Sequence, residues 1–87
     1  MEQYMGDDAI EIGEDIEVDI VLDESGMPIG AIVDDLIVAT GPGGSVTDEI
    51  IDVLDADGNI VLEDETVSIF DANGQLIESE ETITAID

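Results

Sequence analysis

A turn-forming tetrapeptide recurs at a fixed spacing along this chain, and it constrains the fold more than any other feature. The sequence Asp-Ala-Asp-Gly at 55–58 returns as Asp-Ala-Asn-Gly at 71–74, and Asp-Glu-Ser-Gly occupies 23–26. The first two copies start 16 residues apart, and the third starts 32 residues before 55. In such a motif the Asp side chain accepts hydrogen bonds from backbone N–H groups further on, while Gly tolerates a positive φ. Aliphatic runs flank the copies, so the pattern predicts tight β-hairpins with a type I turn and a G1 bulge.

The segments between the turns alternate apolar and polar residues, as half-solvated antiparallel strands do. Residues 16–20 read Ile-Glu-Val-Asp-Ile, and 66–69 read Thr-Val-Ser-Ile. The prediction is therefore an all-β fold, a small antiparallel meander or sandwich of repeated hairpins. Short strands are expected near 9–12, 16–22, 29–33, 36–39, 59–63, 66–70, 75–79 and 82–86.

One segment fits two interpretations. Around 47–56, Thr47 resembles a helix N-cap, acidic residues follow it, and Gly58 is a suitable stop. Apolar residues at 46, 50, 53 and 54 also have helical spacing. The repeat instead places Val53 and Leu54 before a hairpin turn, which favours a strand. A short helix near 47–56 therefore remains an alternative.

The length of 87 residues predicts a single small domain over 1–87. Hydrophobic residues make up 44% of the chain, which supplies material for an aliphatic core despite the high charge. The Gly-Pro-Gly-Gly stretch at 41–44 is the candidate for an internal joint.

The charge is entirely of one sign: 25 Asp and Glu, no Lys, Arg or His, and a net charge of -25. Direct binding to nucleic acid is not expected, because affinity for phosphates comes from Lys and Arg. Anionic membranes should repel the chain. The N-terminus lacks the features of a secretory signal, and no apolar run is long enough to span a bilayer. We expect a soluble protein of the virion or the cytoplasm.

Catalysis has little support in this composition. There is no His for acid–base chemistry, no Cys, and no Lys or His to activate a Ser. Asp55, Asp57 and Asn59 resemble the first ligands of a calcium-binding EF-hand loop. However, Gly58 is fourth rather than sixth, and Thr66 stands where the bidentate Glu belongs. We expect a non-enzymatic protein without a cofactor, with at most diffuse Ca²⁺ or Mg²⁺ around its carboxylates.

Three functional classes are compatible with these features. The first is a structural or assembly module, in its most concrete form a viral capsid-decoration protein, that binds a protein with a basic or apolar surface or a second copy of itself. The second is a DNA mimic that inhibits a nucleic-acid enzyme, of the anti-restriction or anti-CRISPR type. The third is an engineered sequence in a reduced alphabet without a natural function. The densest acidic cluster is the candidate partner-binding site: Asp48, Glu49, Asp52, Glu63, Asp64 and Glu65.

Overall fold

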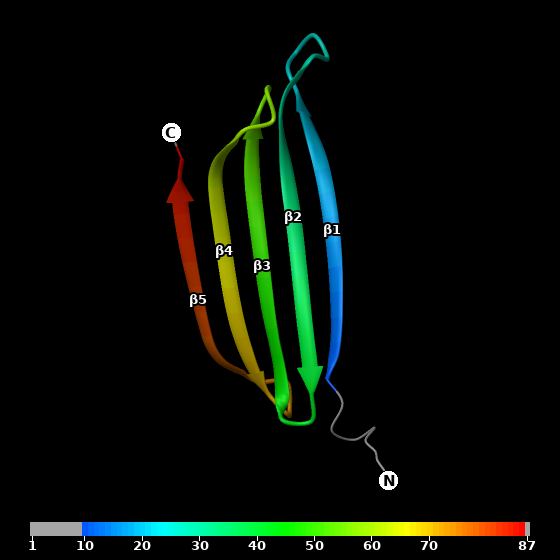
Figure 1. Cartoon of the computed structure of the whole chain (residues 1–87), viewed down its shortest axis with the longest axis vertical. Helices are drawn as coiled ribbons and strands as arrows, with labels where there is room; N and C mark the ends of the chain where they lie inside the picture. Colours follow the sequence, from blue (N-terminus) through cyan, green and yellow to red (C-terminus); the bar gives the residue numbers. More distant parts are fainter. Residues whose placement is uncertain (1–9, 87) are drawn as a thin grey trace.

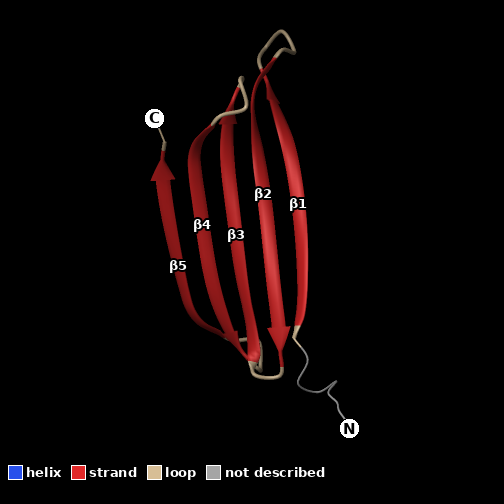
Figure 2. Ribbon diagram, in the orientation of Figure 1, coloured by secondary structure: helices blue, strands red, loops and turns tan. Residues whose placement is uncertain are grey.

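The computed structural model of the chain describes residues 10–86, which form one antiparallel β-sheet (Figures 1 and 2). The five strands pair strictly in chain order, so the sheet is a meander. This confirms the all-β prediction and the meander topology. The strands are β1 (Glu11–Leu22), β2 (Pro28–Gly41), β3 (Gly44–Asp55), β4 (Ile60–Asp71) and β5 (Leu76–Ala85).

The strands are fewer and longer than the sequence suggested. Each of β1, β2, β4 and β5 unites two of the predicted short strands. The predicted breaks at 13–15, 34–35, 64–65 and 80–81 all fall on pairs of adjacent acidic residues. These pairs lie in mid-strand, because an extended strand directs neighbouring side chains to opposite faces of the sheet.

The helix alternative near 47–56 is wrong. β3 is a strand from Gly44 to Asp55 that pairs with β2 on one side and β4 on the other. Ladder hydrogen bonds to two neighbours outweigh the local capping pattern at Thr47, since tertiary context overrides weak helical propensity.

Three of the four hairpins use the repeated motif in the same way, as predicted. The Oδ1 atom of Asp55 accepts hydrogen bonds from the backbone N–H groups of Asp57 (2.9 Å) and Asn59 (3.0 Å). Gly58 has a φ of 86° and donates its own N–H to the Asp55 carbonyl at 3.1 Å. The strand register shifts beside each of these turns, as a bulge requires. The same two Oδ1 bonds occur at Asp23 and Asp71.

The fourth hairpin is the Gly-Pro-Gly-Gly stretch, which joins β2 to β3 within the continuous sheet. Gly41 and Gly44 are registered partners that close this turn. Gly44 has a φ of 140°, and a Cβ on it would collide with the Phe70 carbonyl oxygen of β4. A glycine is therefore required where the turn passes against the neighbouring strand.

The strands of residues 10–86 form a single layer, and none of these residues forms a second layer over it. Between residues 10 and 86 no side chain, apolar or polar, is buried. The side chains of β2, β3 and β4 are mostly half-buried by their neighbours, whereas every residue of the edge strands β1 and β5 is exposed. The Cα radius of gyration is 17.6 Å, where a compact chain of this length has about 12 Å. The aliphatic residues thus form two open faces in place of a core.

The part of the chain that the structure describes contains no helix that is long and apolar enough to cross a membrane. The sequence-based expectation that no secretory signal is present concerns residues 1–9, which lie outside the described residues.

Candidate protein-binding faces

The strand register sorts the side chains onto two faces. Directly paired residues of antiparallel strands point to the same side, and residues alternate along each strand. One face, here called the Ile16 face, carries Ile12, Glu14, Ile16, Val18 and Ile20 of β1 and their registered partners across the sheet. The opposite side, the Leu36 face, carries Glu11, Asp15, Glu17 and Asp19 of β1 and their partners.

An acidic pair lies near the middle of every strand and gives one carboxylate to each face. The result is a zigzag line of carboxylates that crosses all five strands on both sides of the sheet. On the Ile16 face this carboxylate row consists of Glu14, Asp35, Asp48, Glu65 and Glu80. On the Leu36 face it consists of Asp15, Asp34, Glu49, Asp64 and Glu81.

Uncharged residues separate the carboxylates in each row. Glu14 is registered opposite Ile37, and Ile37 in turn opposite Asp48. At the next position on this face, two residues along the strands, the acid lies on β2 instead, where Asp35 is registered between Ile16 and Ile50. Like charges directly opposite each other destabilise a sheet. The alternation of charged and uncharged residues across the strands avoids that contact within the rows. Among the registered pairs, two acids face each other directly at Asp52–Glu63 and at Glu17–Asp34.

The carboxylates of each row meet diagonally across neighbouring strands. On the Ile16 face, a hydrogen bond with Asp35 and the charge of the same group raise the pKa of Glu14. A hydrogen bond with Asp48 raises the pKa of Glu65 in the same way.

The Leu36 face repeats this arrangement between the other strand pairs. A hydrogen bond with Asp34 raises the pKa of Glu49, and one with Asp64 raises the pKa of Glu81. Two carboxyl groups can form such a bond only when one of them holds a proton, so each diagonal pair favours uptake of a proton.

Several carboxylate oxygens in the middle of the sheet have no hydrogen-bond donor. They are shielded from water and, while the diagonal Glu groups are ionised, accept no hydrogen bond within the described residues. A shielded polar atom without a partner is costly, and this chain has no Lys, Arg or His to supply one. The atoms are Oδ1 of Asp34, Asp35, Asp48, Asp52 and Asp64.

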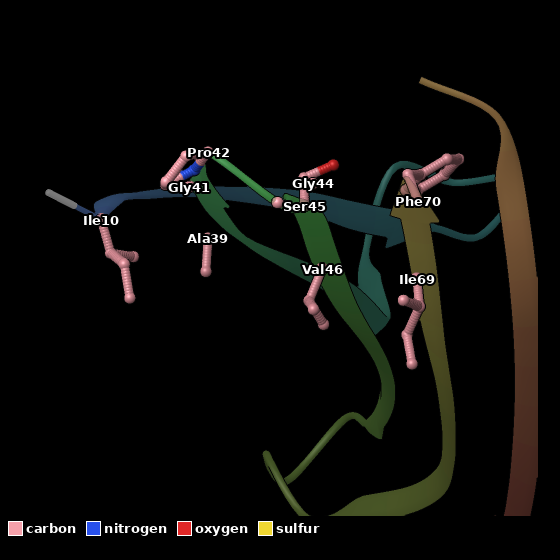
Figure 3. Close-up of a pocket in the computed structure, with 10 residues that line it drawn as sticks. Ile10, Ala39, Gly41, Pro42, Gly44, Ser45, Val46, Ile69 and Phe70 are labelled. Atoms are coloured by element: carbon pink, nitrogen blue, oxygen red, sulfur yellow. The ribbon is translucent and has the colours of Figure 1, made fainter. Parts of the chain in front are cut away.

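A hollow lies on the Ile16 face at the end of the sheet that holds the β2–β3 hairpin. It is an open apolar depression of about 410 Å³. Ile10, Ala39, Val46 and Ile69 point to the same side of the sheet there, whereas Phe70 points to the other (Figure 3). The carboxylate row of this face is thus bordered by exposed aliphatic side chains.

The structure divides the acidic cluster proposed from the sequence between the two faces. Asp48, Asp52, Glu63 and Glu65 lie on the Ile16 face, whereas Glu49 and Asp64 lie on the Leu36 face. The sequence-based cluster omitted the row members of β1, β2 and β5. The recurrence of adjacent acidic pairs at 14–15, 34–35, 48–49, 64–65 and 80–81 is the signal that would have found them.

Within residues 10–86 no group of three or more carboxylates is arranged to hold a metal ion. The EF-hand-like residues form a hairpin turn instead, in which Asp55 binds backbone N–H groups. Comparison with models of known protein families, with characterised proteins and with solved structures gives no match, so function must be inferred from the two faces.

Proposed function

We propose that this chain is a non-enzymatic assembly module, a sheet that binds a protein partner through its open faces. The observation that carries the proposal is the absence of any buried side chain in the described residues. A single-layer sheet with two uncovered aliphatic faces lacks the second layer around which a domain ordinarily forms its core. A partner supplies that layer. Decoration of a larger particle, such as a viral capsid, is the most concrete form of this function.

The exposure of individual side chains supports binding rather than simple solvation. Ile12 is 72% exposed near the start of β1, and Ile16 is 56% exposed in the interior of the same regular strand. Contiguous exposed apolar surface on a soluble protein ordinarily marks an interaction site.

DNA mimicry is the alternative, and the placement of the acids supports it less well. The two carboxylate rows lie on opposite faces, so they cannot enter one basic groove together. Within a row there is one carboxylate per strand, or one per roughly 4.8 Å, against one phosphate per roughly 3.4 Å on each DNA strand. Aliphatic side chains also alternate with the acids, whereas a phosphate backbone has none.

The test is the behaviour of the purified chain at neutral pH and low salt. Hydrogen exchange followed by mass spectrometry is expected to show weak protection even in β3, since no layer covers the sheet. A monomer by sedimentation with strongly protected central strands would refute the proposal.

Capture of partners from the source lysate separates the two candidate functions. Release of a basic nucleic-acid enzyme by competing duplex DNA would favour mimicry. Recovery of assembly subunits that duplex DNA does not release would favour the assembly module.

A further inference from the structure

We infer that the Ile16 face is the docking surface and that its occupant is a protein element bearing a row of Lys or Arg bordered by aliphatic side chains. This inference rests on the proposed assembly function and specifies the face and the chemistry of the partner.

The choice of face follows from the edge strand β1, which is strongly one-sided. Its Ile16 face carries four aliphatic side chains and a single acid, all exposed. Its Leu36 face carries four acids, which would each have to be desolvated or paired under a partner. The other edge strand, β5, is one-sided in the opposite sense, with Leu76 and Ile83 on the Leu36 face. Among the residues that the register pairs over all five strands, more of the exposed large apolar side chains nevertheless lie on the Ile16 face. Because burial of apolar area drives association, the Ile16 face has more to gain.

The basic character of the occupant follows from the unsatisfied carboxylates. Oδ1 atoms of Asp35, Asp48 and Asp52 on this face are shielded from water, and they receive no hydrogen bond while the neighbouring Glu groups are ionised. Covering them with another apolar surface would increase that cost, whereas Lys or Arg would donate to them. The chain itself has no cation to offer. A second copy at neutral pH would place one carboxylate row against another, and close like charges are unfavourable.

The area of the face suits a stable complex. Five strands of about 4.8 Å spacing and about 40 Å length give a footprint of roughly 1,000 Å². A standard protein–protein interface takes roughly 800 Å² from each partner. Full coverage of the Ile16 face is therefore enough for a specific interface.

The geometry of the row sets the spacing of the partner's cations. Diagonal neighbours in the zigzag row lie about 7–8 Å apart, but along the row its carboxylates advance by roughly 4.8 Å per strand. Lys or Arg on successive turns of one helix, roughly 5.4 Å apart, match this spacing, as do cations on neighbouring strands. The depression beside Val46 and Ile69 would receive an aliphatic side chain that borders the cation row.

The experiment uses the full chain and a synthetic probe. The probe is a helical peptide of about 14 residues with a Lys stripe at i, i+4, i+7 and i+11 and Leu on both sides of the stripe. In the control peptide Gln replaces every Leu. Binding is measured by calorimetry at neutral pH and low salt, and the contacted face is located by amide shifts in NMR spectra.

Adjacent acids provide a matched pair of protein variants. The first carries D35N, D48N and E65Q and removes three charges from the Ile16 face. The second carries D34N, E49Q and D64N and removes three charges from the Leu36 face on the same three strands. Both variants lose the same charge, and each also relieves repulsion, so neither is expected to impair folding.

We expect the Lys–Leu probe to bind the Ile16 face more tightly than the Gln control. The first variant should weaken binding roughly tenfold or more, from three ion pairs acting together, while the second should change it little. Equal loss in both variants, equal affinity for both peptides, or no binding at all would overturn the inference. A dimer at neutral pH that the substitution Ile16→Asp abolishes would also overturn it, because the occupant would then be a second copy. None of these outcomes alters the hydrogen-exchange and sedimentation test of the assembly function.

Discussion

The diagonal carboxyl pairs predict that mild acid stabilises this protein. The pKa values of Glu14, Glu49, Glu65 and Glu81 are all raised by hydrogen bonding to an Asp on the next strand. An acid whose folded-state pKa is raised holds its proton more tightly in the folded state than in the unfolded chain. Stability therefore increases as the pH falls through the folded-state pKa, and the gain is complete below the unfolded value of about 4.3.

The hairpin turns oppose this gain at still lower pH. Hydrogen bonding to Ser25 and to the Met27 N–H lowers the pKa of Asp23, and the Asn59 N–H is the main group that lowers the pKa of Asp55. The stability from these two groups is present above the unfolded pKa of about 3.9 and is lost as the pH falls through their lowered folded-state values. The two effects together place maximal stability near pH 4–5, below the usual range of about 5–8.

The size of the pH effect depends on how many more protons the folded chain binds than the unfolded chain. With four raised glutamates, the folded chain should bind more protons than the unfolded chain as the pH falls from neutral toward the unfolded pKa of about 4.3, by a fraction of a proton for each glutamate. Thermal unfolding followed by circular dichroism at constant ionic strength should show Tm rising from pH 7 to about 4.5 and falling below about 3.5. Calorimetry in buffers of different ionisation enthalpy measures the proton difference directly.

A pair of four-fold variants separates the diagonal pairs from general charge repulsion. Glu→Gln at 14, 49, 65 and 81 should raise Tm at pH 7 and remove most of its rise on acidification. Glu→Gln at 11, 17, 24 and 78 removes the same charge outside the rows and should leave that rise in place. A Tm that is flat or falls from pH 7 to 5, or equal behaviour of the two variants, would refute the reasoning.

Three further predictions concern the turns and the net charge. Asp55→Ala removes the acceptor of two backbone N–H groups and should lower Tm by several degrees. Asp57→Ala leaves those hydrogen bonds in place and should not lower Tm. Equal effects of the two substitutions in denaturation curves would contradict the turn assignment. Gly44→Ala should cost roughly 2 kcal/mol or more, since its φ of 140° and the Phe70 carbonyl leave no room, whereas Gly13→Ala, in open space on β1, should be neutral or stabilising by about 0.5–1 kcal/mol in urea unfolding. Raising NaCl from about 0.01 M to 1 M shortens the screening length from about 30 Å to 3 Å and should raise Tm, and an unchanged Tm would show that repulsion among the carboxylates is unimportant.

The hairpin turns could be predicted from the sequence because their chemistry is local. In each Asp-x-x-Gly copy, the residues that form the turn lie within five positions of one another. The regular spacing of the repeat along the sequence likewise predicted a β meander. These features depend on neighbouring residues and not on the rest of the fold.

Strand length and the binding faces could not be obtained in this way. Asp34-Asp35 looks like a break in a strand, because two adjacent acids seldom lie in the middle of a buried one. Only the pairing of β2 with both β1 and β3 shows that the two carboxylates leave the sheet on opposite sides. The diagonal contact of Asp34 with Glu49 similarly depends on the register of two strands. The absence of a core is a global property that hydrophobic content does not reveal.

The 16-residue unit of one strand and one turn has a consequence for how such a sheet can change its size. In a domain with a core, an inserted strand must displace packed side chains on other strands. Here each described strand is hydrogen-bonded to the strands next to it in chain order, so duplication of one unit would widen the sheet by roughly 4.8 Å and lengthen both carboxylate rows by one group. Width, charge and the number of contact points for a partner would then grow together in equal steps. The number of 16-residue units would therefore determine how wide the sheet is and how large a partner surface it can cover.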